Sequence, residues 1–95
     1  MSLTSSQIRQ FRSLAHSLKP VVRIGDKGLT NNLLAELERA LEDHELIKVS
    51  IAGAQREERR TITQELCQVT GAYLIQIIGR MSILYRPNKK EGKKE

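Results

Sequence analysis

AYLIQIIGRMSILYR, residues 72–86, is the stretch that decides the fold. Its two halves, 72–78 and 81–86, are rich in β-branched and aromatic side chains, which favours two strands. Gly79 and Arg80 between them suit a two-residue type II′ hairpin, in which glycine takes the positive φ. The C-terminal part of the domain is therefore expected to be a pair of antiparallel strands.

Three helices and two further strands are expected before this hairpin. Thr4 and Gln7 have the spacing of a capping box, and apolar residues then recur at helical intervals. Pro20 disfavours helix in the residue before it, Thr30 is a favourable N-cap, and Gly71 is a natural helix stop. The expected elements are a helix over 4–18, a strand over 21–24, a helix after Thr30, a strand over 47–52, a helix over 55–70, and strands over 72–78 and 81–86.

This order, α-β-α-β-α-β-β, predicts a single two-layer α/β domain over residues 1–87. Strand–helix–strand connections make the first three strands parallel, and the hairpin makes the last strand antiparallel. The result is a mixed four-stranded sheet packed on helices. Alternation along the strands leaves one sheet face polar and partly open. The residues expected on that face are Lys48, Ser50, Gln76, Ser82 and Arg86.

Positive charge gathers at the two ends of the chain, whose formal net charge is +5. Residues 1–30 carry five basic side chains against one acidic, residues 31–60 five against seven, and residues 61–95 six against three. Such a distribution fits a polyanionic partner, although on charge alone a solvated basic surface fits equally well. Residues 88–95, NKKEGKKE, have no apolar side chain to bury, so we expect a basic disordered tail.

Signals of enzymes, metal sites and membrane proteins are missing from the sequence. The lone Cys67 has no visible base to activate it, and His16 and His44 belong to no cluster at metal-ligand spacing. There is no P-loop, GxGxxG or serine nucleophile elbow. No apolar run approaches the ~20 residues of a membrane span, and there is no signal peptide. We therefore expect no catalytic residue, cofactor, metal or small-molecule substrate, and a cytoplasmic protein.

Residues 25–28, GDKG, are a candidate contact with a phosphate. Glycine lets a backbone approach a ligand closely, and the helix that follows presents free N–H groups and a positive dipole end. Lys27 adds a charge at the same place. In KH domains a GXXG loop clamps the nucleic-acid backbone, although that loop joins two helices. Because glycines also form ordinary turns, GxxG alone leaves both interpretations open.

Three runs of the chain resemble the CRM domain, and specifically its small stand-alone bacterial members of the YhbY type. They are LAHSLKPVVRIGDKGLT (14–30), LEDHELIKVSI (41–51) and IIGRMSILYRP (77–87), and their order and spacing make the resemblance specific. It implies an RNA-binding domain whose stand-alone bacterial members associate with precursors of the large ribosomal subunit. It also implies a fold similar to the C-terminal domain of a bacterial translation initiation factor.

The GxxG loop of the family falls on Gly25, Asp26, Lys27 and Gly28. Many members carry a basic residue after the first glycine, whereas the Asp26 carboxylate here would repel a phosphate. Tyr85 is expected to pack in the sheet rather than stack on a base. Around the loop, we expect phosphate contacts from basic residues that flank it or lie on the hairpin. These are Arg9, Arg12, Lys19, Arg23, Lys48, Arg80 and Arg86.

Together these features predict a monomeric binding module that recognises structured RNA by shape and backbone. Its expected RNA is ribosomal RNA in large-subunit precursors, whose assembly it would assist. The alternative is a docking module on a ribosomal protein or assembly factor, with incidental RNA contact. That alternative would use the acidic face of the second helix, from Glu36 to Asp43. Steep salt dependence of binding would favour RNA.

Overall fold

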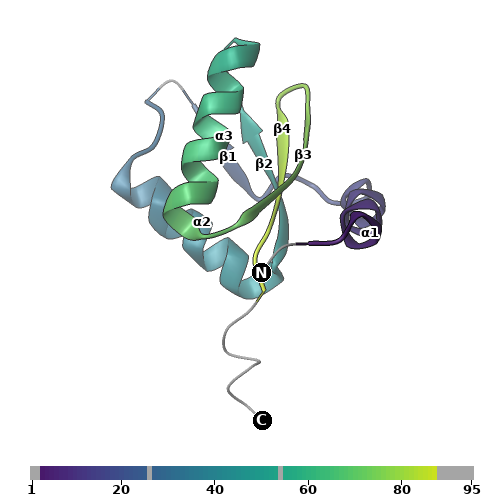
Figure 1. Ribbon diagram of the computed structural model, residues 1–95. Helices are drawn as coiled ribbons and strands as arrows, with labels where there is room; N and C mark the ends of the chain where they lie inside the picture. The colour runs from purple at the N-terminus through teal and green to yellow at the C-terminus, as the bar shows by residue number, and fades with distance from the viewer. Residues whose placement is uncertain (1–2, 26, 54, 88–95) are drawn as a thin grey trace.

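The sheet contains four strands, β1 (Val22–Ile24), β2 (Leu46–Ile51), β3 (Tyr73–Ile78) and β4 (Met81–Tyr85). In the computed structural model their order is β1-β2-β4-β3, so the last strand lies between the second and the third (Figure 1). β1 and β2 are parallel, and β4 is antiparallel to both β2 and β3. The first three strands therefore run in one direction, and the predicted mixed sheet is confirmed.

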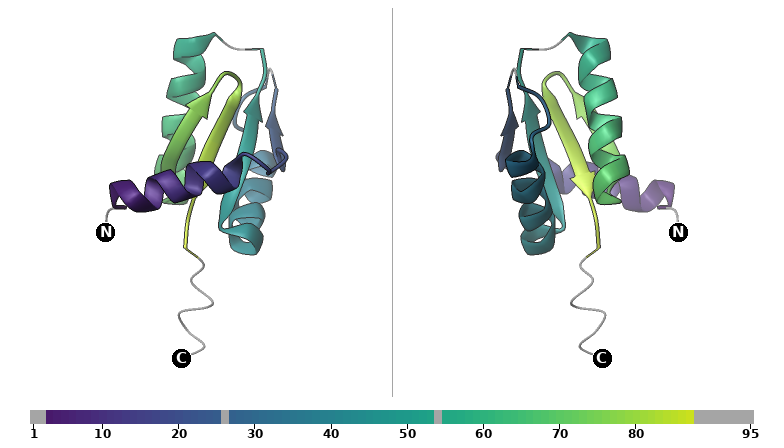
Figure 2. Two further views of the ribbon diagram at one scale, coloured as in Figure 1. Left: turned by 90° about the vertical axis from the view of Figure 1, so that its right-hand side faces the viewer. Right: turned by 90° about the vertical axis from the view of Figure 1, so that its left-hand side faces the viewer.

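Three helices cover the sheet unequally: α1 (Ser5–Ala15), α2 (Asn31–His44) and α3 (Arg56–Thr70). Figure 2 shows α2 and α3 side by side on one face, while α1 alone crosses the other face. The sheet and the α2–α3 pair are the two layers expected from the sequence. α1 adds a partial cover on the opposite side, and part of that sheet face extends beyond the helix.

The structure describes residues 3–25, 27–53 and 55–87. Asp26 of the GDKG loop and the expected tail, residues 88–95, lie outside the described residues. Within the described ranges, no helix combines the length and the apolar character that crossing a membrane requires.

The helix ends follow the predicted caps. The Thr4 hydroxyl accepts from the Gln7 N–H (3.1 Å), and the Gln7 side chain accepts from the Thr4 N–H (2.9 Å), which completes the capping box. Gly71 ends α3 with φ 74°. α1 ends at Ala15, three residues earlier than expected, because the next turn tightens to i→i+3 bonds such as Leu18 N–H to Ala15 C=O (3.1 Å).

Thr30 caps α2 directly after the GDKG loop. Its hydroxyl accepts from the Leu33 N–H at 3.1 Å. Replacing Thr30 by alanine leaves that N–H without its partner, so we expect the free energy of unfolding to fall by about 1 kcal/mol. Urea denaturation followed by circular dichroism measures this loss. Thr30→Ser keeps the oxygen and should stay within a few tenths of a kcal/mol of the wild type, whereas equal losses in both variants would contradict the capping role.

The main core lies between the sheet and the α2–α3 pair. Apolar side chains alternate along the strands and meet one stripe of each helix. Burying such side chains is the largest favourable term in folding. The fully buried members of this core include Ile24, Leu37, Leu41, Ile47, Val49, Ile51, Leu66 and Leu84.

Ser82 does not lie on the polar sheet face where the alternation placed it, so that prediction is wrong. The strand register sets Ser82 opposite Val49, which points into the α2–α3 core. Ser82 is 1% exposed, and its hydroxyl lies 2.7 Å from the hydroxyl of Thr63 on α3. The Thr63 hydroxyl also donates to the Arg59 carbonyl at 2.8 Å, so both buried polar groups are satisfied.

Candidate nucleic-acid interface

α1 covers one half of its sheet face through an aromatic cluster. The Phe11 ring stacks on Tyr85 with ring centroids 4.2 Å apart, and the Tyr73 and Tyr85 ring centroids are 6.4 Å apart. Ala15 and Ile75 are buried in the same cluster. Tyr85 therefore packs in the sheet, as expected. Because the chain has no other tyrosine or phenylalanine and no tryptophan, this packing involves every such ring.

The other half of this sheet face extends beyond α1 (Figure 2). It carries both charged and apolar side chains. Cross-strand partners share a face, so the strand register defines its rows. We call this half the open face. Its rows are Lys48–Ile83–Gln76 and Arg23–Ser50–Met81–Ile78.

The GDKG loop and the β3–β4 hairpin meet at one end of the open face. The Ala52 N–H donates to the Ile24 carbonyl (2.9 Å), which directly precedes the loop. The neighbouring Ile51 N–H donates to the carbonyl of Arg80 in the hairpin (2.8 Å). These bonds place Gly25, which follows Ile24, and Arg80 on the two sides of the end of β2, at the carboxyl ends of the parallel strands. That end is a usual location for ligand sites in open α/β sheets.

The fold requires glycine at only one of the two glycine positions of the GDKG loop. The Gly28 N–H donates to the Gly25 carbonyl at 3.1 Å, and Gly28 needs its glycine because φ is +68°. Gly25 has no positive φ, and a Cβ built there would meet nothing within 4 Å. Packing therefore does not require glycine at position 25, whereas close approach of a ligand to the backbone would.

Gly25 can be tested without disturbing the fold. We expect Gly25→Val to leave the free energy of unfolding within about 0.5 kcal/mol of wild type, because the added side chain meets open space. The same change should weaken binding to structured RNA, since the branched side chain stands where a ligand would approach the backbone. Urea denaturation and fluorescence anisotropy measure the two effects. Unchanged RNA affinity would make Gly25 an ordinary turn residue.

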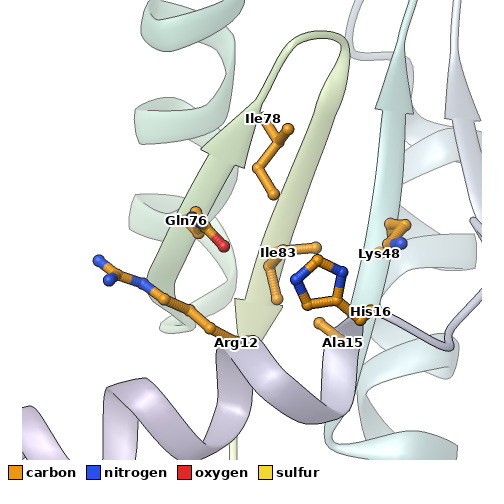
Figure 3. A pocket seen from close by; sticks show the side chains of 7 residues that line it. All are labelled: Arg12, Ala15, His16, Lys48, Gln76, Ile78 and Ile83. Carbon is orange, nitrogen blue, oxygen red and sulfur yellow. The ribbon is translucent and has the colours of Figure 1, made fainter.

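One side of α1 borders the open face with basic residues. Arg9, Arg12 and His16 are exposed, and their i, i+3, i+7 spacing places them along one side of the helix. Arg12 and His16 line a shallow pocket of about 30 Å³ together with Lys48 and Gln76 (Figure 3). Helix and sheet thus bring together positions that are distant in the sequence.

The positive charge around the open face is not balanced by nearby acids. Arg86, whose guanidinium pairs with Glu38 and Glu42, lies on the other side of the sheet. Unpaired cations on one surface create a positive potential that attracts polyanions. The basic side chains that border the open face without a carboxylate partner are Arg12, Arg23, Lys48 and Arg80.

Arg86 lies apart from these residues, which corrects its expected place on the polar face. Its guanidinium contacts Glu38 (2.8 Å) and Glu42 (3.2 Å) on α2 and donates to the Thr70 carbonyl (2.9 Å) at the end of α3. Its side chain is only 11% exposed. Arg86 therefore connects α2 to the C-terminal end of α3, and little of its side chain is exposed to a phosphate. It also engages two carboxylates of the acidic α2 face.

Lys19 is separated by α1 from the end of the sheet at which the GDKG loop lies. It lines an apolar groove of about 510 Å³ with Val21, His44 and Lys48. Lys48 lines both this groove and the pocket beside Arg12, so it connects the two. A further hollow near the start of α3 contains Arg56, Arg60 and the Glu57 carboxylate, which does not suit a phosphate.

Cys67 is not placed to act as a nucleophile. Burial raises the pKa of its thiol from 9.0 to about 11, so the thiol stays protonated at neutral pH. No group of three or more His, Cys, Asp or Glu side chains in the described part of the chain could hold a metal ion.

The raised pKa of the Cys67 thiol predicts that the stability of the fold decreases at high pH. Between pH 9 and 11 the unfolded chain releases this proton while the folded protein keeps it, so stability falls as pH rises through that window. We expect a larger drop in the urea midpoint from pH 8 to pH 10.5 for the wild type than for Cys67→Ala. Equal drops in both proteins would mean that the thiol titrates normally in the fold.

Two residues of this region were not among the predicted contacts. Gln76 was expected on the polar face, and it does lie opposite Ile83, the partner of Lys48. A β-bulge between Leu74 and Gln76 sets this register, and no local pattern in the sequence indicates it. His16 was assigned to a helix end, which is correct, but only the crossing of α1 over the sheet brings it beside Lys48.

Comparisons with known proteins identify the family and agree with the fold. Residues 3–86 match the family model of the CRS1/YhbY (CRM) domain. A "Probable RNA-binding protein" of Pseudomonas aeruginosa is 52% identical, covering 98% of this chain and 89% of the relative. An "RNA-binding protein" of Haemophilus influenzae is 46% identical, covering 95% and 92%. The solution structure of a hypothetical protein from Staphylococcus aureus superposes with a TM-score of 0.82 at 35% identity, covering 93% and 92%.

Proposed function

Because this chain belongs to the CRS1/YhbY (CRM) domain family, we propose that it binds structured RNA through the open face and its basic border. We further propose that this RNA is ribosomal RNA in precursors of the large subunit, and that the protein assists assembly in the cytoplasm as a monomer. The names of the bacterial relatives support the RNA-binding part.

The observation that carries this proposal is the gathering of unpaired cations on one side of the sheet. α1, β1, β2 and the hairpin each contribute at least one basic side chain, and the Gly25 backbone is accessible beside them. On the other side, Arg86 pairs with Glu38 and Glu42, and the exposed arginines of α2 and α3 share these helices with acidic side chains. A polyanion is therefore attracted to the open face, with counterion release as the driving force.

The proposed mode of recognition is mainly through phosphates and shape. A sheet that reads single strands by stacking needs exposed aromatic rings, and here Phe11, Tyr73 and Tyr85 pack against one another. Arg12, Arg23 and Lys48 would contact phosphates, as would Arg9, Lys19, Lys27 and Arg80 around them. The basic tail, residues 88–95, would add sequence-independent affinity.

Recovery of RNA from cells tests the proposal. Tagged protein would be captured from extract with and without ribonuclease, and the bound RNA sequenced. We expect enrichment of precursor large-subunit RNA over mature ribosomal RNA, and loss of the co-purifying ribosomal proteins after ribonuclease treatment. Association with ribosomal proteins that survives the nuclease would instead favour a protein-docking module. Enrichment of other RNA classes would reject the ribosomal assignment.

A further inference from the structure

The pocket between α1 and the sheet has the form of a step. Ala15 and His16 at the end of α1 make its wall, while Ile83 and Ile78 of the open face make its floor (Figure 3). Ile83 is 1% exposed, but Ile78, nearer the hairpin, is 50% exposed. The floor therefore continues from the pocket onto an accessible aliphatic surface.

The Gln76 side chain places an amide at this step. Figure 3 shows its side chain directed from β3 toward the pocket. It is partly buried, and in the ranges that the structure describes its amide has no hydrogen-bond partner within the protein. An amide offers donors and an acceptor side by side, and it can pair with the edge of a base such as adenine.

His16 supplies an aromatic surface beside the amide. Its side chain is exposed, and in the view of Figure 3 the imidazole lies between Ile83 and Lys48. Since the tyrosine and phenylalanine rings are packed under α1, His16 is the ring that the open face presents. Histidine rings, like other aromatic side chains, stack on unpaired bases.

The chemistry of the pocket fits a nucleotide better than a bare phosphate. Arg12 and Lys48 can neutralise a phosphate, and no carboxylate lines the pocket. A phosphate alone, however, would gain nothing from the aliphatic floor or the free amide. The volume is small, about 30 Å³, so the pocket can take only the edge of a base, and the rest of the ring would stay outside it.

We propose that this step receives one unpaired base of the bound RNA, stacked against His16 and read at its edge by the Gln76 amide. The proposal rests on the proposed RNA-binding function and adds to it a preference for RNA with an extruded nucleotide. Arg12 and Lys48 hold the flanking phosphates. Recognition is then not wholly by backbone and shape, because one position of the RNA contributes sequence information.

Matched RNA probes test this inference. One probe is a fully paired duplex, and the other is the same duplex with a single unpaired adenosine in the middle of one strand. Fluorescence anisotropy would measure both affinities for the wild type, for Gln76→Leu and for the control Gln64→Leu, which lies exposed on α3 across the sheet. Thermal unfolding by circular dichroism establishes that all three proteins are folded.

We expect the wild type and Gln64→Leu to bind the bulged probe about tenfold more tightly than the paired one, and Gln76→Leu to lose most of that preference. Affinity for the paired duplex should be similar in all three proteins. Equal binding of both probes by the wild type, or a preference that survives in Gln76→Leu, would overturn the base pocket while leaving RNA binding intact. Failure to bind either probe would reject the proposed function itself.

Discussion

Replacing Arg12, Arg23 and Lys48 together by glutamine should lower the affinity for structured RNA on the order of 100-fold at moderate salt, while the fold survives. These side chains come from α1, β1 and β2 and lie around the open face without carboxylate partners. If each contacts one phosphate, the slope of log K against log salt should also fall by about 2 to 3. Anisotropy titrations over a salt series measure both quantities.

A matched control separates site from net charge. Arg39, Arg56 and Arg60 are exposed on α2 and α3, across the sheet from the open face. Their joint replacement by glutamine removes the same charge, and we expect it to change the affinity by only a few-fold through the long-range potential. If the two triple variants lose affinity equally, binding depends on net charge and the open face is not the site.

Arg86→Met should have the opposite profile, with a loss of stability and little change in RNA affinity. The Arg86 guanidinium supplies a donor to the Thr70 carbonyl at the C-terminal end of α3, and it pairs with Glu38 and Glu42. Both carboxylates are partly exposed, so their ion pairs contribute modestly. With the partly buried hydrogen bond to Thr70 included, we expect the free energy of unfolding to fall by about 2 kcal/mol.

The comparison for Arg86 is an exposed arginine on the same side of the molecule. Arg39→Met removes an arginine from α2 and should cost no more than about 0.5 kcal/mol in urea denaturation. RNA affinity of Arg86→Met, measured well below its melting temperature, should stay within about twofold of wild type apart from the general effect of one charge. A large loss of affinity in a folded Arg86→Met protein would return this residue to the interface.

Local signals predicted the elements well because each is set by neighbouring residues. The Thr4–Gln7 capping box, the Thr30 cap and the Gly71 stop depend on bonds within one turn of the chain. Gly79 takes a φ of 57°, as the hairpin requires. The parallel direction of the first three strands follows from their helical connections, so the chain order alone predicts it.

Non-local pairing could not be predicted in the same way. The insertion of β4 between β2 and β3 decides which faces its residues occupy, and it sends Ser82 to Thr63 instead of to the polar face. Arg86 finds its partners on α2, more than forty positions earlier in the chain. The sequence shows that Arg86 is basic, but it does not show that Arg86 would contact two carboxylates of α2 and the end of α3.

The candidate site also has a part that local sequence features predict and a part that depends on the tertiary structure. The GDKG loop was visible in the sequence because glycines and a following helix cap are local features. The open face was only partly visible, since Lys48 and Gln76 could be placed by alternation, whereas the position of α1 beside them could not. His16 therefore joined the site only when the structure brought it to the pocket with Lys48.

The most direct test of the central claim is sedimentation of cell extract through a density gradient at low and high salt. The protein would be either wild type or the Arg12, Arg23 and Lys48 glutamine variant, with folding verified beforehand by circular dichroism. We predict that the wild type migrates with large-subunit precursors at low salt and leaves them at high salt, while the variant stays at the top throughout. Co-migration of both proteins at both salt concentrations, or a wild type that never leaves the top fractions, would contradict the account.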